Sequence, residues 1–223
     1  MAYPDGSATH IGVEYQCWFL ALQISFSFFE PDRIIYPEAF ITDVSIIDDI
    51  KVVENGVTTF YNVKHISPAK SMHWNISELV SNCVVKHIKQ QYEVDRKAKI
   101  VFVSQSDCYL ITEVFQRAVN AITVNDLDMV LASKRCIENW ESAKEVFDYD
   151  DQTLLGLAQN VSMRCLPLYE IKKLIEHRFT TLGHHKNLAN LFVAKSLECS
   201  GRKTRITKGL INGWLLECGI NFK

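Results

Sequence analysis

The sequence has 223 residues, of which 48% are hydrophobic and 22% charged, and its formal net charge is −2. This composition excludes a disordered or fibrous chain, and the near-neutral charge excludes a polycationic surface, so nucleic-acid binding would need a local basic patch. Seven scattered cysteines without a Cys-x-x-Cys pair argue against a disulfide framework or a zinc site and favour a reducing, cytoplasmic environment.

The first predicted element is a helix over residues 11–28 that is apolar on nearly all sides and is therefore expected to be buried. Polar residues such as Glu14, Gln16 and Gln23 interrupt the apolar run, and no basic residue precedes it. A membrane span needs about 20 uninterrupted apolar residues, and a signal peptide needs a positive leader. We therefore expect no association with a membrane.

A loop punctuated by Pro31 and Pro37 comes next, and β-rich runs follow over residues 39–44, 46–53 and 57–66. Asn55-Gly56 between the last two runs predicts a hairpin with a two-residue turn, because both central residues of such a turn take positive φ.

This turn fixes which residues face each other. If Glu54 faces Val57, then Asp49 lies opposite Asn62, and Asn62 shares a sheet face with Lys64 because side chains alternate along a strand. Asp48 would point to the other face, and a bulge would exchange the two aspartates.

After the hairpin the sequence predicts a helix, a strand and a second helix, and the rest of the chain is predicted to be helical. A helix over 77–92 with Ser77 as N-cap, a strand over 99–104 and a helix over 109–121 complete an α/β core over residues 1–122. Residues 123–223 are expected to complete the same domain or to form a small helical subdomain. The helices predicted there span residues 134–146, 152–159, 168–181, 186–199 and 207–218.

A carboxylate, an amide and a lysine on one sheet face are the parts of a phosphodiesterase site. Hard oxygen ligands such as Asp49 and Asn62 hold Mg²⁺, which acidifies a bound water, and a lysine such as Lys64 stabilises the charge that develops on the phosphate. The alternative is an exposed cross-strand ion pair in a helical interaction protein.

These residues resemble the motif of PD-(D/E)XK nucleases. Together with GVEYQ at residues 12–16, DDI at 48–50 and YNVKH at 61–65, they are similar to one branch of that superfamily. That branch is the N-terminal endonuclease domain of bacterial antiphage effectors, including CBASS effectors, STAND-type ATPases and helicase-partnered nucleases. The resemblance covers residues 11–105 and implies a restriction-endonuclease-like fold that cleaves double-stranded DNA with Mg²⁺ or Mn²⁺.

The resemblance also implies roles for individual residues. Asp49 would bind the metal, Glu14 would approach it from the first helix, and Lys64 would be the catalytic lysine. Asn62 occupies a position where the family has Glu or Gln, and its shorter stem predicts weak Mg²⁺ affinity and a preference for Mn²⁺. A catalytically impaired domain that binds DNA or assembles is the alternative. The expected supporting residues are Gln16, Asp48 and His65.

A basic segment near the end of the chain is a candidate for DNA binding. Residues 185–223 carry seven basic and two acidic residues. The candidates for binding phosphate are Arg202, Lys203, Arg205 and Lys208. A solvated basic loop is the alternative reading. Because the whole chain has a net charge of −2, we expect it to act as a homo-oligomer or with a defence ATPase or sensor domain, so that several basic patches combine.

Overall fold

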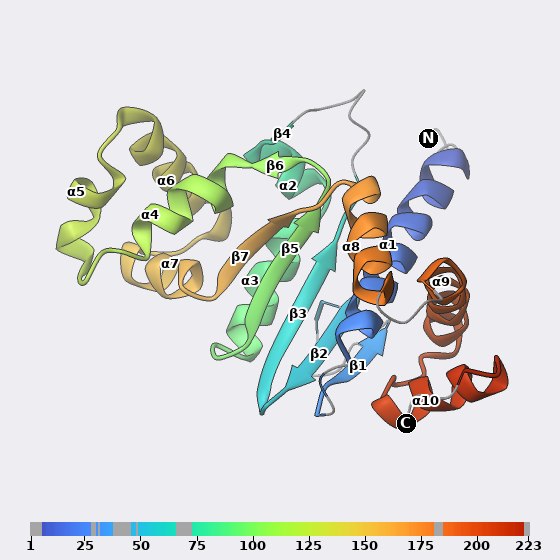
Figure 1. Cartoon of the computed structure of the whole chain (residues 1–223). Coiled ribbons are helices and arrows are strands. Elements are labelled where there is room, and N and C mark those ends of the chain that lie inside the picture. Colours follow the sequence, from blue (N-terminus) through green and yellow to red (C-terminus); the bar gives the residue numbers. More distant parts are fainter. Residues whose placement is uncertain are drawn as a thin grey trace.

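A five-stranded mixed sheet with helices on both faces forms the centre of the computed structural model (Figure 1). The structure describes residues 6–27, 30, 32–37, 46–47, 49–65, 73–180 and 185–220. The strands, in their order across the sheet, are β1 (Ile34–Pro37), β2 (Ile50–Glu54), β3 (Val57–Val63), β5 (Lys99–Ser104) and β7 (Val161–Cys165). β2 is antiparallel to both β1 and β3, and β3, β5 and β7 are parallel to one another. The predicted α/β class, with a mixed sheet flanked by helices, is confirmed.

The hairpin between β2 and β3 has the predicted register. Glu54 pairs with Val57, and Ile50 pairs with Tyr61. The turn residues Asn55 and Gly56 have φ of 50° and 77°, the positive values that a two-residue turn requires. Asp49, one residue before β2, therefore lies at the end of the hairpin where β3 finishes.

One sheet face is covered by helices from both ends of the chain. Their shared apolar cluster includes Phe19, Tyr61, Val103, Phe179 and Phe192. Phe19 is fully buried, which confirms the expected burial of the first helix. No helix of the described residues is long and apolar enough to cross a membrane. The helices on this face are α1 (Gly6–Ser27), α8 (Leu168–Thr180), α9 (His185–Arg202) and α10 (Lys208–Glu217).

The opposite face packs against the middle of the chain, in a cluster that includes Phe60, Phe102, Phe115 and Trp140. A short parallel pair of strands lies beside it, formed by β4 (His73–Trp74) and β6 (Asp107–Cys108). Its helices are α2 (Ile76–Ser81), α3 (Val84–Val94), the π-helix η1 (Leu110–Phe115), α4 (Gln116–Ala118), the 3₁₀ turn η2 (Val124–Asp126), α5 (Leu127–Leu131), α6 (Lys134–Phe147) and α7 (Asp151–Ala158).

Two strands of the five-stranded sheet lie where the sequence predicted none, as do the short strands β4 and β6. The loop expected between residues 31 and 37 contains β1, and Pro37 is tolerated because it ends an outermost strand. β7 lies between two correctly predicted helices and pairs with β5. Its side chains are mostly half-exposed or exposed, so it lacks the apolar run that marks a buried strand. The strand expected at residues 39–44 lies outside the described residues.

Two predicted helices differ in detail. The helix expected over 77–92 is divided into α2 and α3 at Cys83, whose φ of 60° is left-handed, and its N-cap is Asn75 rather than Ser77. Asn75 accepts a hydrogen bond from the N–H of Glu78 and forms a capping box with it. The helix expected over 109–121 consists of η1 followed by one turn of α4.

Candidate active site

The predicted site residues meet where the parallel strands end. Lys64 and His65 directly follow β3, and Gln105 follows β5. Asp49 directly precedes the antiparallel β2, so it lies at the same edge of the sheet. The arrowheads of β3, β5 and β7 all point to this edge, which is uppermost in Figure 1. The topology therefore gathers side chains from four separate segments, including α1.

Asp49 is a buried carboxylate held by three donors. Its exposed fraction is 8%. Gln16 Nε2 donates to Oδ1 at 2.7 Å, and the backbone N–H of Val63 donates to Oδ2 at 2.8 Å. Lys64 Nζ donates to the same Oδ2 at 3.3 Å. Burying a carboxylate is costly unless it is hydrogen-bonded, and these donors both offset the cost and fix the orientation of the group.

Lys64 differs from the other two donors because its ammonium is at the end of a long, partly exposed side chain and can move away from Asp49. Its side chain is 27% exposed, whereas Gln16 sits on a helix and the Val63 N–H belongs to a strand. Lysine is a compact charge on a flexible stem, so Nζ can reach other nearby acceptors. The other two donors would still hold Asp49 after that movement.

Asn62 has an unusual environment for an amide. It is fully buried, and neither Oδ1 nor Nδ2 has a hydrogen-bond partner among the described residues. Asn62 follows Tyr61 and Asp49 precedes its partner Ile50, so the two side chains start from neighbouring positions of the hairpin. An unsatisfied buried polar group costs about 1–3 kcal/mol. The amide oxygen is therefore available to a ligand.

These residues fit a hard cation with few protein ligands. No group of three or more His, Cys, Asp or Glu side chains suited to a metal occurs among the described residues. Mg²⁺ needs only one or two carboxylates, because waters and substrate phosphate complete its octahedral shell. Asp49 offers the carboxylate, and the unsatisfied Oδ1 of Asn62 offers a second oxygen. The ligand atoms offered by both residues are oxygens, which Mg²⁺ and Mn²⁺ prefer.

Glu14 forms an ion pair with α8 in the structure. Its side chain is 51% exposed and lies 3.6 Å from Lys172 Nζ on α8. Residues two apart on a helix point about 200° away from each other, so Glu14 and Gln16 cannot both face the carboxylate. Gln16, expected only as a supporting residue, is the α1 side chain that reaches it.

His65 lies beside the cluster and is fixed by its neighbours. Its Nε2 is 2.9 Å from Gln105 Nε2, and its ring contacts the ring of Tyr15 at 5.8 Å between centroids. Tyr15 is itself anchored by a hydrogen bond from its hydroxyl to the carbonyl of Leu166. Burial lowers the pKa of His65, and the negative charge of Glu14 partly offsets that effect. Burial therefore favours the neutral form of the imidazole.

The structure does not bring the basic segment to this edge. Arg202 pairs with Glu198 at 3.0 Å, and Arg205 is exposed. Lys203 has a φ of 51°, and Lys208 begins α10. α10 lies at the lower end of the molecule in Figure 1, away from the carboxyl ends of the strands. Asp48 lies outside the described residues.

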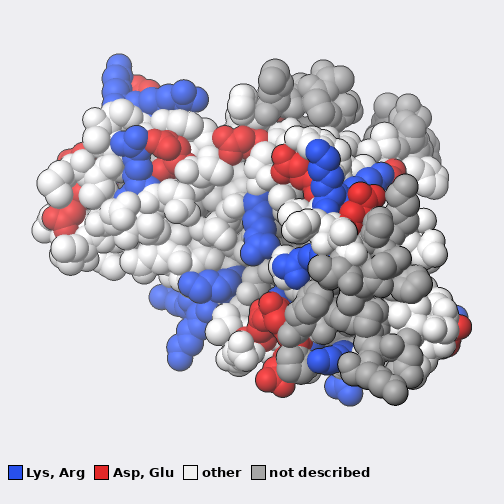
Figure 2. Space-filling model, viewed as in Figure 1, with Lys and Arg blue, Asp and Glu red and all other residues white. Residues whose placement is uncertain are grey.

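Lysine and arginine side chains are dispersed over the visible face. Figure 2 shows basic side chains at the upper left, at the centre and lower left, and on the right of this face, with acidic side chains among those at the upper left and on the right. This distribution agrees with the low net charge of −2.

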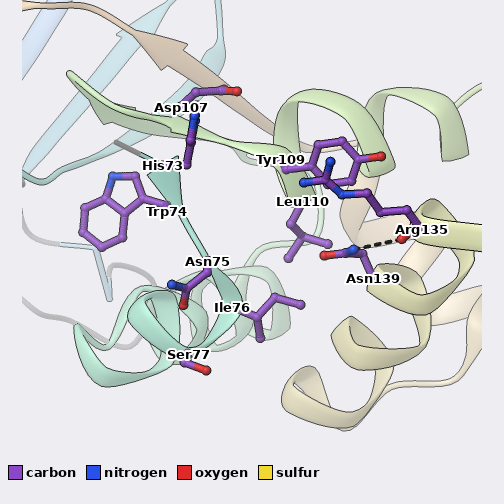
Figure 3. A pocket seen from close by; sticks show the side chains of 10 residues that line it. All are labelled: His73, Trp74, Asn75, Ile76, Ser77, Asp107, Tyr109, Leu110, Arg135 and Asn139. Atoms are coloured by element: carbon purple, nitrogen blue, oxygen red, sulfur yellow. Dashed lines mark hydrogen bonds between the residues drawn. The ribbon is translucent and has the colours of Figure 1, made fainter. Parts of the chain in front are cut away.

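A cleft that was not predicted from the sequence adjoins the sheet edge. It has a volume of about 580 Å³ and lies between the β4–β6 pair and α6 (Figure 3). Trp74, in its wall, donates from Nε1 to Ser104 Oγ at 2.9 Å, and Ser104 is the last residue of β5. Its lining residues are His73, Trp74, Asn75, Ile76, Ser77, Asp107, Tyr109, Leu110, Arg135 and Asn139.

Residues 6–199 match the family model described as Cap4, dsDNA endonuclease domain. A search of curated proteins found no match.

Solved structures of one receptor share the fold. The Acinetobacter baumannii Cap4 SAVED/CARF-domain containing receptor with the cyclic trinucleotide 3'3'3'-cAAA is 16% identical, with a TM-score of 0.60, and the match covers 92% of this chain and 45% of the receptor. The same receptor with 2'3'3'-cAAA also gives 16% and 0.60, covering 92% and 46%. A further structure of it gives 16% and 0.58, covering 92% and 47%. The chain thus spans less than half the length of these receptors.

Proposed function

Because the chain belongs to the Cap4 dsDNA endonuclease domain family, we propose that Asp49, Asn62 and Lys64 form the active site of a metal-dependent endonuclease acting on double-stranded DNA. Family membership confirms the resemblance to the endonuclease domain of bacterial antiphage effectors. The PD-(D/E)XK type of site and the need for Mg²⁺ or Mn²⁺ are part of the proposal.

One observation carries this assignment. A buried carboxylate and a partly exposed lysine, from segments that meet only in the folded chain, pair at 3.3 Å where two strands end. An exposed cross-strand ion pair contributes little to stability, and its residues need no hydrogen bonds from other elements. Asp49, in contrast, is supported by Gln16 from α1 and by the N–H of Val63. Such fixed support is expected of a group that must hold its orientation during a reaction.

Each residue of the cluster has a distinct task in this mechanism. Asp49 and Asn62 would hold a divalent ion, which when bound acidifies a water and neutralises charge on the phosphate. Lys64 Nζ would leave Asp49 and donate to a non-bridging phosphate oxygen, where negative charge increases in the transition state. Gln16 and the Val63 N–H would keep the carboxylate in place while Lys64 is away.

Plasmid cleavage tests the assignment directly. We expect the chain to nick or linearise plasmid DNA with Mg²⁺ or Mn²⁺ and to be inactive with EDTA. Asp49→Ala and Lys64→Ala should each lower the cleavage rate by at least about 10³-fold, because each removes a group that acts on the reacting phosphate. Lys99→Ala is the matched control, since Lys99 is an exposed lysine at the opposite end of β5. Cleavage by Lys64→Ala at the parental rate would refute the site, and circular dichroism would establish that the variants are folded.

A domain that binds DNA without cutting it is the second candidate. It is favoured by the amide at position 62, where the family pattern has Glu or Gln, and by the single carboxylate in direct contact with Lys64 among the described residues. In that case the unsubstituted chain would bind DNA but would cleave it with neither Mg²⁺ nor Mn²⁺.

A sensor module is the partner that we propose for this domain. The similar receptors contain SAVED/CARF domains, were solved with cyclic trinucleotides, and are more than twice as long as the part that this chain matches. A nuclease domain of net charge −2 would gain affinity for DNA if the partner or a second copy placed several basic patches together. Light scattering with and without DNA would show whether the chain forms such an assembly by itself.

A further inference from the structure

The geometry points to a nucleobase-binding cleft beside the active-site edge, in which Arg135 and Tyr109 hold a base that has left the DNA stack. This inference rests on the proposed function, because it takes DNA as the substrate. The cleft is the one between the β4–β6 pair and α6, with a volume of about 580 Å³. That size is in the range of small-molecule sites and is sufficient for a nucleoside.

Arg135 is placed for a ligand rather than for helix stability. Its guanidinium lies 4.0 Å from the centroid of the Tyr109 ring, and the side chain is exposed. It forms no ion pair with any residue that the structure describes, whereas its neighbour Lys134 pairs with Glu138. Arg135 is the second residue of α6, and a cation at a helix N-terminus opposes the helix dipole. A planar cation stacked on an aromatic ring offers its other face to a base.

Tyr109 is held in position from two sides. Its hydroxyl is 3.2 Å from Cys136 Sγ, and Arg135 covers its ring. Tyr109 also immediately precedes the π-helix η1, over residues Leu110–Phe115. π-helices are rare, and they occur frequently at functional sites because the extra residue changes where side chains point.

The rest of the lining suits a base better than a bare phosphate. Asp107 and Arg135 both line the cleft, so it carries both signs of charge (Figure 3). Ile76 and Leu110 supply apolar surface. Asn139 Nδ2 donates to the carbonyl of Arg135 at 2.8 Å, and its Oδ1 points into the cleft. An amide oxygen near a stacking platform accepts hydrogen bonds from the edge of a base.

The cleft is connected to the active-site edge through β5. Trp74 in the cleft wall bonds to Ser104, the next residue Gln105 approaches His65, and His65 follows Lys64. A DNA strand whose phosphate lies at Lys64 would therefore have a nearby nucleotide within reach of the cleft. Removing a base from the stack costs free energy, which stacking on Arg135 and Tyr109 would offset.

Equilibrium binding without divalent metal tests the inference independently of cleavage. The probe is a fluorescent 20-base-pair duplex in EDTA, measured by anisotropy with the full chain. Arg135→Ala should weaken binding about tenfold, the effect of one stacked base. Arg135→Lys should weaken it nearly as much, because it keeps the charge and loses the plane. Lys134→Ala, the matched control on the same helix turn, should change the affinity less than about twofold.

Three results would overturn the inference. They are parental affinity for Arg135→Lys, equal losses for Lys134→Ala and Arg135→Ala, and a folded Arg135→Ala that binds like the parent. The first two would show charge attraction alone. If Arg135→Ala binds and cleaves DNA like the unsubstituted chain, the cleft inference fails and the proposed function stands. If binding depends on Arg135 but no cleavage occurs, the proposed function fails and the cleft inference stands.

A crosslinking experiment identifies the source of the base. Duplexes containing 5-iodouracil at successive positions, irradiated in the complex, should crosslink to a peptide containing Tyr109 at one or two of those positions. Excess dAMP or dGMP should not compete. Arg135-dependent binding of a free nucleotide with no crosslink from the duplex would assign the cleft to a free nucleotide and overturn the DNA assignment.

Discussion

The Asp49–Lys64 cluster and the basic segment at residues 202–208 differ sharply in how they hold charge. Asp49 is 8% exposed and accepts hydrogen bonds from Gln16 on α1 and from the consecutive residues Val63 and Lys64 at the end of β3. Arg202 is 74% exposed, and its ion pair is with Glu198 of the same helix. Both regions are candidates in the sequence. Ile206 anchors the basic segment to β1 through its backbone, but the side chains of Arg202, Lys203 and Arg205 are exposed, so the charge of the first region is buried and that of the second faces solvent.

This difference in burial predicts that the first region affects the rate of cleavage and the second affects the affinity for DNA. A buried and interlocked charge keeps its orientation and is only weakly screened, so its loss should change the rate of a reaction. An exposed charge on a long side chain adjusts to its partner and is screened by salt, so its loss should change binding. Substitutions in each region test this separation.

Gln16 should matter more than Glu14 for cleavage. Gln16→Ala removes the donor to Asp49 Oδ1, and loss of a group that orients a metal ligand typically costs about 10- to 100-fold in metal affinity or activity. Glu14→Ala removes a half-exposed carboxylate whose partner is Lys172, and we expect a change of less than about threefold. Initial rates on plasmid DNA at fixed Mn²⁺ measure both. A larger loss for Glu14→Ala would restore it as the helix-one ligand that the family resemblance implies.

Asn62→Asp should strengthen metal binding. The substitution keeps the shape of a fully buried side chain and adds a carboxylate beside Asp49. More ligand charge raises affinity for a hard cation, so half-maximal cleavage should need less Mg²⁺ by a factor on the order of ten. The same variant without metal should melt at a lower temperature than the parent, because two neighbouring buried carboxylates repel each other. An unchanged Mg²⁺ titration would remove position 62 from the metal site.

The basic segment should affect DNA binding alone. A variant with Ala at positions 202, 203, 205 and 208 should weaken DNA binding several-fold. It should also reduce the slope of log affinity against log salt by about 0.9 for each phosphate that the protein no longer neutralises. The cleavage rate at saturating DNA should stay at the parental value, because α10, which this segment leads into, lies away from the carboxyl ends of the parallel strands. A parental salt slope would identify the segment as a solvated surface.

The parts of the site that depend on local geometry were predictable. Asn55-Gly56 fixed the hairpin register, which placed Asp49 beside the end of β3 and next to Lys64. Gln16 could be associated with the site only through the family resemblance, because 33 residues separate it from Asp49. The cleft at Arg135 could not be predicted, since it joins β4, β6 and α6 across short elements that carry no periodic signal.

The sequence by itself determined the buried first helix, the hairpin and its register, and the helical character of most of the second half. Each of these follows from neighbouring residues, through apolar periodicity or the positive φ of a turn. Only the tertiary structure decided that β7 joins the sheet, that Gln16 rather than Glu14 reaches Asp49, and that Arg135 stacks on Tyr109 over a cleft. The reason is physical: these interactions join residues far apart in the chain, and packing of whole elements fixes them where local preference is weak.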